Sequence, residues 1–477
     1  MPPSLKEKAV RGMFWSSVER FSVQGIQFVV LVVMARLLTP ADYGLVGMLA
    51  IFLAVSQSLV DSGFSQALIR KQDRTETDNS TVFYFNIAVG LVLYGLLFLS
   101  APLVAGFYRT PELEPVMRVL CLGVVFNSLA VVQRALLTVR IDFKTQAKAS
   151  LSGAVLSGVA GFWMASSGCG VWAIVAQQLL NLGVNTLLLW VFSGWRPRRT
   201  YSWSSFRGLF SFGSKMLASG LLDVAYRNIY LIAIGRLFTA TNLGYYTRAH
   251  QFAEFPSSNL TGILQRVTYP VLCEIQDDDA RLAPAYRRFL RVSAFLIFPL
   301  MSGLAAVAEP LVLLLLKEQW LFAATLLQIL CLAMMWYPVH AINLNLLQVK
   351  GRSDLFLRLE VIKKALGVGV LCVTIPLGLV PMCVGQIVTA FFSLVINTHY
   401  TGKLIRVGFL RQMGDLLPTL LLSLGMGVAV YIAIQRLSSP GVQLCAGIPL
   451  GILLYIVAAR LLRFPELGEV LALLKKR

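Results

Sequence analysis

The sequence predicts an all-α protein that crosses a membrane many times. Its 477 residues are 57% hydrophobic and only 14% charged, whereas a soluble domain carries about 25% charged residues. The apolar residues also stand in long runs, such as Phe28–Ala35, Ile87–Leu99 and Leu311–Leu316. Runs of this kind, with a mean hydropathy of +0.72, are typical of helices that span a bilayer.

An internal duplication is the second observation. The stretch Ala35–Gly44, ARLLTPADYG, returns without a gap as Gly235–Gly244, GRLFTATNLG. Two further islands follow in the same order, where APLV and VMRVLCL of the first half match EPLV and LLQILCL of the second. We therefore predict two direct copies of one unit of about 200 residues.

Taken in order, apolar stretches of roughly 20 residues bounded by charge, proline or glycine predict about fourteen transmembrane helices. In the first half they cover residues 13–38, 42–69, 80–106, 114–139, 146–166 and 170–193. In the second half they cover residues 209–236, 241–274, 287–308, 322–349, 356–379 and 382–401. Two extra C-terminal helices, 413–436 and 442–462, have no counterpart in the duplication.

These helices predict four parts of the chain. Residues 1–205 form an N-terminal six-helix bundle, 206–405 a second six-helix bundle that repeats the first, and 406–464 the two extra helices. Residues 465–477 place acid early, base late and leucine and valine on one stripe. This pattern predicts a short interfacial helix on the inner leaflet.

The distribution of lysine and arginine predicts the orientation. Every second connection carries several basic residues, for example Arg70/Lys71/Arg74 and Arg196/Arg198/Arg199, while the connections between them carry one or none. The positive-inside rule therefore places both termini in the cytoplasm, which requires an even number of helices. Six helices in each half make the two repeats parallel. The net charge of +19 is explained by these loops, so we expect no nucleic acid partner.

The loops and the reactive side chains argue against an enzyme. No loop exceeds about twenty residues, which leaves no chain for a catalytic domain outside the bilayer. The three histidines do not have the spacing of a metal site, the cysteines form no Cys-x-x-Cys motif, and no glycine-rich phosphate loop is present. We therefore expect neither catalysis nor a bound cofactor or metal.

Charged residues inside the predicted spans are the candidate functional residues. Each costs about 2.5–3.5 kcal/mol at the centre of a bilayer, so such residues usually face a bundle interior or a wet cavity. They gather on helices 1, 2, 7 and 8, the helices that flank the repeated stretch. The candidates are Asp61 on helix 2, Lys215, Asp223 and Arg227 on helix 7, and Arg248, His250 and Glu254 on helix 8.

Spacing leaves two interpretations of these charges open. Asp223 and Arg227 are four residues apart and Lys215 lies eight before Asp223, so the three share one helix face. Intrahelical pairing is the alternative to a cavity lining for Asp223–Arg227 and for His250–Glu254. Lys215 and Arg248 could instead extend toward the membrane surface. Arg227 is the hardest to explain by either alternative.

Two long stretches resemble the Wzx-type polysaccharide flippases of the multidrug/oligosaccharidyl-lipid/polysaccharide exporter superfamily. One runs from FWSSVERFSVQGIQFVV through ARLLTPADYG to SQALIRKQD, and the other from IGRLFTATNLGYYTRAHQFAEFPSSNLTG to YPVLCEIQDD. The resemblance implies a MATE-like V of two six-helix bundles, a central cavity lined by helices 1, 2, 7 and 8, and alternating access. It also implies a multi-pass protein of the bacterial inner (plasma) membrane.

The same resemblance implies the cargo and the partners. The cargo would be an undecaprenyl-pyrophosphate-linked oligosaccharide, moved across the inner membrane for lipopolysaccharide, capsule or exopolysaccharide assembly. Membrane lipids, a polysaccharide polymerase and glycosyltransferases would be partners. With this cargo, Arg227, Arg248 and Lys215 are candidates for binding the head group, and Asp223, Glu254, Asp61 and His250 for the cavity and for coupling to protons or sodium.

Two other functions stay open at this stage. A MATE-like cation-coupled drug or metabolite antiporter would use the same fold, but it should have a cavity dominated by carboxylates. Here the cavity helices carry at least as many arginines and lysines as acids. A membrane enzyme of polysaccharide assembly is the other alternative, and the short loops argue against it.

Overall fold

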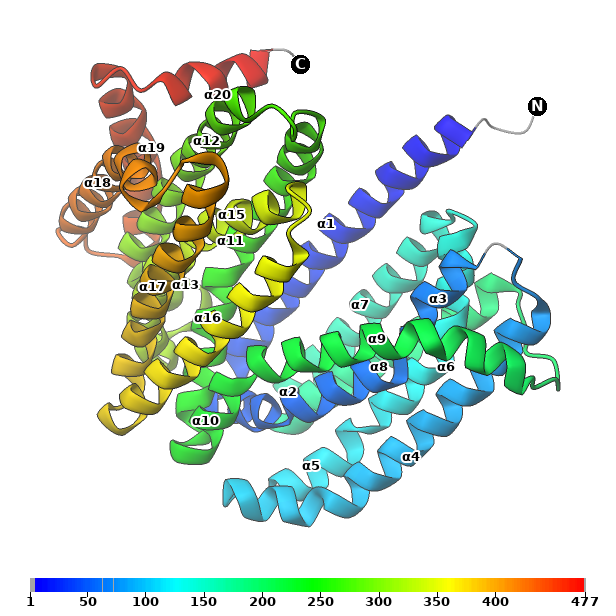
Figure 1. Ribbon diagram of the computed structural model, residues 1–477. Helices are drawn as coiled ribbons and strands as arrows, with labels where there is room; N and C mark the ends of the chain where they lie inside the picture. The colour runs from blue at the N-terminus through cyan, green and yellow to red at the C-terminus, as the bar shows by residue number, and fades with distance from the viewer. Residues whose placement is uncertain (1–4, 62, 72, 476–477) are drawn as a thin grey trace. The chain divides into compact units, whose positions relative to one another are not determined.

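The computed structural model describes residues 5–61, 63–71 and 73–475, and all the regular elements in these ranges are helices (Figure 1). The chain divides into two compact units, Met1–Gly244 and Tyr245–Arg477. The predicted boundary near residue 205 concerns the duplicated sequence rather than this division, and it stays a prediction.

Unit 1 contains ten helices and the start of an eleventh among its described residues. They are α1 (Leu5–Leu37), α2 (Pro40–Asp61), α3 (Phe64–Arg70), α4 (Glu76–Tyr108), α5 (Leu113–Leu120), α6 (Leu122–Val139), α7 (Phe143–Ser166), α8 (Val171–Ser193), α9 (Trp203–Arg227), α10 (Ile229–Leu237) and the first turn of α11 (Ala240–Glu274).

Small residues bring α7 against its neighbours α1 and α8. A Cβ added to Gly158 would lie 2.6 Å from Cγ2 of Val30 on α1, and one at Gly161 would lie 2.9 Å from Cβ of Gln177 on α8. Such positions let helix backbones approach closely, which is how apolar helices associate in a bilayer. The three helices therefore form one packed layer of unit 1.

An aromatic core holds the segment between α8 and α9 against α4. Phe83 of α4 packs against Trp195 with ring centroids 5.7 Å apart, and both side chains are buried. The indole Nε1 of Trp195 also donates a hydrogen bond to Oε2 of Glu76 at 2.7 Å. Phe64 of α3 packs against Phe85 in the same cluster. This core fixes where α9 begins.

Unit 2 holds the remainder of α11 and the helices after it. Its further described elements are α12 (Asp279–Ala306), α13 (Ala308–Leu316), η1 (Glu318–Trp320), α14 (Leu321–Met334), α15 (Tyr337–Val349), α16 (Ser353–Thr374), η2 (Ile375–Leu377), α17 (Leu379–Ile405), α18 (Phe409–Ile434), α19 (Pro440–Leu461) and α20 (Pro465–Lys475).

Ion pairs and one buried hydrogen bond hold the C-terminal helices of unit 2 on α12. The hydroxyl of Tyr455 on α19 donates to the carbonyl oxygen of Phe295 at 2.9 Å. Arg291 pairs with Glu466 at 2.9 Å, and Arg288 pairs with Glu469 at 2.9 Å. The predicted tail helix is therefore present as α20, and its acidic face contacts α12.

All fourteen predicted spans are largely helical, but several are interrupted. The stretch 42–69 is split into α2 and α3 at Gly63, which has a positive φ of 68°. The stretch 209–236 begins earlier, at Trp203, and is interrupted at Asn228. These breaks correct the predicted continuous helices, since a left-handed glycine and a local cap end each regular helix.

Ten segments of the described chain are long and apolar enough to cross a membrane. The predicted spans outside these ten are 13–38, 209–236, 241–274 and 356–379. Two of the four are helices 7 and 8, which carry six of the seven candidate residues named above. The protein is thus a multi-pass helical membrane protein, whereas the number fourteen and the repeat architecture stay predictions.

Candidate functional site

The two copies of the repeated stretch each begin a helix with a threonine cap. Thr39 precedes α2, and its Oγ1 accepts the backbone N–H of Asp42 at 3.3 Å. Thr239 precedes α11, and its Oγ1 accepts the backbone N–H of Asn242 at 3.2 Å. The same threonine in both copies therefore satisfies a free backbone donor at the start of a helix.

These two helix starts contact each other reciprocally within unit 1. A Cβ at Gly44 would lie 1.8 Å from the carbonyl oxygen of Ala240, and a Cβ at Gly244 would lie 1.8 Å from that of Pro40. Only glycine leaves room for backbones this close. The repeated glycine is therefore required where α2 and α11 begin.

Arg227, the first candidate for the head group, lies at the end of α9 in an exposed ion pair. Its Nε donates to Oδ2 of Asp223 at 2.7 Å, and the two side chains are 68% and 47% exposed. The intrahelical pair that the spacing allowed is thus formed, but it leaves most of the guanidinium accessible. Lys215 lies on α9 as well, and its side chain is outside the described part of the structure.

The candidates in unit 2 lie along the first half of α11. Nη1 of Arg248 donates to Oε1 of Gln251 at 2.6 Å. Nδ1 of His250 lies 3.5 Å from Oε2 of Glu254, so the second intrahelical pair is also formed, with Glu254 about half exposed. One turn earlier, the hydroxyl of Tyr246 accepts a hydrogen bond from Nε2 of Gln386 at 3.0 Å.

Asp61, the candidate on α2, belongs to a polar cluster that the sequence did not predict. Arg134 of α6 interacts electrostatically with both Asp61 and Glu19 of α1. The Oγ of Ser150 on α7 donates to Oε1 of Glu19 at 2.9 Å. Four helices of unit 1 thus bring two carboxylates and one guanidinium together.

Arg134 was missed because spacing along the chain cannot show which helices meet. A signal did exist, because Arg134 is the one charged residue in the apolar stretch Leu122–Val139. A charge at such a position usually has a partner or a cavity nearby. The partners themselves, Asp61 and Glu19, follow only from the packing of α1, α2 and α6.

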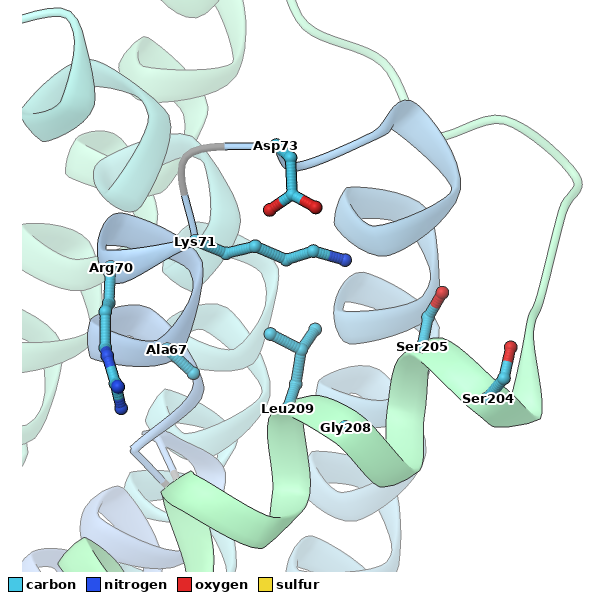
Figure 2. Close-up of a pocket in the computed structure, with 8 residues that line it drawn as sticks. All are labelled: Ala67, Arg70, Lys71, Asp73, Ser204, Ser205, Gly208 and Leu209. Carbon is cyan, nitrogen blue, oxygen red and sulfur yellow. The ribbon is translucent and has the colours of Figure 1, made fainter.

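A separate cavity of about 390 Å³ lies beside α3 and the start of α9, within unit 1. Figure 2 shows Lys71 and Asp73 extending into it from one side and Ser205 facing it from α9. The lining residues are Ala67, Arg70, Lys71, Asp73, Ser204, Ser205, Gly208 and Leu209. This cavity was not predicted, although Arg70 and Lys71 were recognised as loop cations.

The described residues contain no group of three histidine, cysteine, aspartate or glutamate side chains that could hold a metal ion.

Residues 33–325 match a family described as polysaccharide biosynthesis protein, a stretch longer than half of the 477-residue chain. The chain belongs to this family.

Two relatives and one solved structure extend the comparison. The teichuronic acid biosynthesis protein TuaB of Bacillus subtilis (strain 168) is 28% identical over 74% of each chain. The lipopolysaccharide biosynthesis protein WzxC of Escherichia coli (strain K12) is 25% identical over 90% of this chain and 89% of its own. The lipid II flippase MurJ in an inward closed conformation has a TM-score of 0.76 with 13% identity, covering 94% of this chain and 99% of its own.

In this polysaccharide biosynthesis protein, the matched stretch contains every predicted site residue. It also contains Arg134 and the residues that line the cavity, whereas Glu19 precedes it. The similarity to MurJ shows the fold, and it covers more of the chain than the matched stretch does. The roles of the individual residues stay predictions.

Proposed function

We propose that this protein is a flippase that moves an undecaprenyl-pyrophosphate-linked oligosaccharide from the inner to the outer leaflet of the bacterial inner membrane. The product would serve lipopolysaccharide, capsule or exopolysaccharide assembly. Family membership over residues 33–325 is the single observation that carries the proposal. The names of TuaB and WzxC place those relatives in the synthesis of teichuronic acid and lipopolysaccharide, which are cell-envelope polymers.

The chemistry of the cargo explains why cations are needed. A pyrophosphate carries about two negative charges, and their transfer into hydrocarbon without partners is prohibitive. Arg227 supports the proposal because its side chain is 68% exposed while its Nε donates to Asp223. The remaining N–H groups could hold phosphate oxygens in a bidentate arrangement. In this proposal Arg248, nearer the outer face, and Lys215, nearer the inner face, receive the head group in turn.

Alternating access is the proposed transport cycle. The division of the chain into two compact units supports it, because rigid bodies can exchange their accessible side without unfolding. Asp61, Asp223, Glu254 and His250 are the candidates for carrying a coupling proton or sodium ion. Both termini would be cytoplasmic, and polymerase and glycosyltransferases would be partners.

A cation-coupled drug or metabolite antiporter is the second candidate function. The half-buried carboxylates Glu19 and Asp61 favour it, because a cation antiporter needs acidic groups within its spans. Arg134 interacts electrostatically with both of them and offsets their charge. An arginine in this position would oppose a cationic cargo, so we prefer the flippase.

Deletion of the gene in its own host tests the two functions against each other. For a flippase, the surface polysaccharide is lost and the lipid-linked oligosaccharide accumulates in the inner leaflet, while the wild-type gene restores export. A deletion strain with normal surface polysaccharide and increased sensitivity to cationic drugs would contradict the flippase and support the antiporter.

A further inference from the structure

The cavity beside α3 and α9 is formed by packed residues of unit 1. Its floor is formed by Ala67 and Leu209, which are buried in the aromatic core. The wall on α9 is fixed because the backbone N–H of Ser202 donates to Oγ1 of Thr81 at 3.0 Å, which ties the start of α9 to α4. Its volume of about 390 Å³ exceeds that of about ten water molecules in the liquid.

The side chains around this cavity carry charges of both signs. Nζ of Lys71 lies 2.8 Å from Oδ2 of Asp78, whose side chain is only 1% exposed, so this cation is neutralised from below. Arg70 and Asp73 line the same cavity and are exposed. They carry one positive and one negative group. In Figure 2 the carboxylate of Asp73 lies at the top near Lys71, and the side chain of Arg70 extends downward at the left. This arrangement fits a ligand that carries both charges.

The surroundings of the cavity match the head-group region of a membrane. Tyr201 and Trp203, immediately before and at the start of α9, are 52% and 66% exposed. Exposed tyrosine and tryptophan are enriched at the level of lipid head groups. Ile69 and Phe210 follow the cavity residues on α3 and α9 and are also exposed, so an acyl chain would find apolar surface beside the cavity. In the orientation proposed above, this level is the inner leaflet.

We propose that the cavity binds the phosphoethanolamine head group of a phospholipid. Arg70 contacts the phosphate, and the ammonium of Lys71 donates its remaining N–H groups to it while keeping its pair with Asp78. The hydroxyl of Ser204 assists, whereas that of Ser205 is hydrogen-bonded to Asp78. The carboxylate of Asp73 accepts hydrogen bonds from the primary ammonium of the head group. A choline head group has the same charge but lacks N–H donors, and a glycerol head group lacks the cation altogether, so both bind more weakly.

Native mass spectrometry of the purified full-length chain in detergent tests this lipid site. Dissociation constants are measured for phosphatidylethanolamine, phosphatidylcholine, phosphatidylglycerol and undecaprenyl pyrophosphate. We expect phosphatidylethanolamine to bind most tightly of the four at this cavity. Arg70→Gln should weaken it about fivefold, because one basic group near a lipid phosphate contributes about that factor. Asp73→Asn should remove the preference over phosphatidylcholine without weakening phosphatidylglycerol.

A substitution that reduces the cavity provides a second test, and the same substitution outside the cavity is its control. Gly208 lines the cavity, and a Cβ there would meet nothing within 4 Å, so Gly208→Leu starts from open space and reduces the cavity. Gly95 on α4 is equally open and lies outside the cavity, so Gly95→Leu should bind lipid as the wild type does. Unchanged binding in Gly208→Leu would overturn the site. Tighter binding of undecaprenyl pyrophosphate or phosphatidylglycerol, strengthened by Asp73→Asn, would show an anion site and overturn the phosphoethanolamine assignment. Because binding is measured without transport, neither result depends on the proposed flippase activity.

Discussion

Two sets of polar side chains lie among apolar helices, one in each unit, and they differ in charge and in exposure. In unit 2, Nδ2 of Asn343 donates to Gln412 at 3.1 Å, and Nε2 of Gln412 donates to Thr401 at 2.9 Å. All three residues are neutral and buried. In unit 1, the ion pair of Arg227 and Asp223 is charged and exposed.

This difference distinguishes polar side chains that stabilise the fold from polar side chains that we assign to function. Neutral amides and hydroxyls that satisfy one another can be buried, and removal of one leaves the others without partners. Charged groups that stay accessible gain little stability from their pairing. Since the insertion of a charge into a bilayer is costly, we infer that the exposed guanidinium of Arg227 serves an interaction with something other than the protein.

The largest effect should follow Arg227→Ala, which we expect to lower export about 10- to 100-fold. A hydrogen bond to a charged group contributes about 1.5–3 kcal/mol, and this variant would lose it to the head group. The amount of protein in the membrane should not change, because the side chain is exposed. Surface polysaccharide in a complemented deletion strain, normalised to membrane protein, is the measurement.

Two milder variants separate the contribution of the Arg227 charge from that of its geometry and of its partner Asp223. Arg227→Lys should keep part of the activity, since the charge survives and the bidentate arrangement does not. Asp223→Asn should be less harmful than Arg227→Ala if Asp223 only orients the arginine. Normal export by Arg227→Ala would mean that the pair is structural and that the comparison between the units fails.

Gln412→Leu should change export less than Arg227→Ala does, but it should clearly lower the stability of the protein. This variant removes the hydrogen bonds that Gln412 makes with Thr401 and Asn343 in a buried place, at a cost of about 1–3 kcal/mol. Thr401 and Asn343 keep the hydrogen bond between them. Thermal unfolding in detergent should shift to lower temperature, while export per molecule stays normal. The exposed Gln435, at the end of the same helix, provides the control Gln435→Leu. Lost export in a fully stable Gln412→Leu would assign a functional role to the neutral network.

The smallest effect is expected from Gln27→Ala, with less than about a twofold change in export. Gln27 occupies the position in the first repeat that Arg227 occupies in the second, and it is exposed but uncharged. A neutral side chain cannot replace the hydration of a pyrophosphate as a guanidinium can. Losses as large as those of Arg227→Ala, at equal protein level, would indicate a symmetric site shared by both repeats.

Local patterns in the sequence predicted more of the fold than of the site. Apolar runs placed the helices because burial in a bilayer depends on length and hydropathy, which are local properties. The break at Gly63 carried a glycine signal that the long apolar run 42–69 concealed. The ion pair Asp223–Arg227 and the contact between His250 and Glu254 followed from their spacing of four residues.

These local patterns could not predict which helices contact one another. The grouping of Glu19, Asp61 and Arg134 depends on three helices that are distant in the chain. The cavity beside α9 likewise depends on where that helix begins. It begins at Trp203 rather than at the predicted residue 209, and Trp195 and Ser202 hold its start in place. Such convergence requires the packed structure.

Translocation in a defined system tests the central claim most directly. The purified protein is reconstituted into liposomes that carry a lipid-linked oligosaccharide in one leaflet, and a lectin reports its appearance in the other. The proposed function predicts that the wild type accelerates appearance of the sugar, that Arg227→Ala does not, and that Gln27→Ala does. Appearance at the rate of protein-free liposomes for the wild type, with a native cargo from the same host, would contradict the flippase assignment.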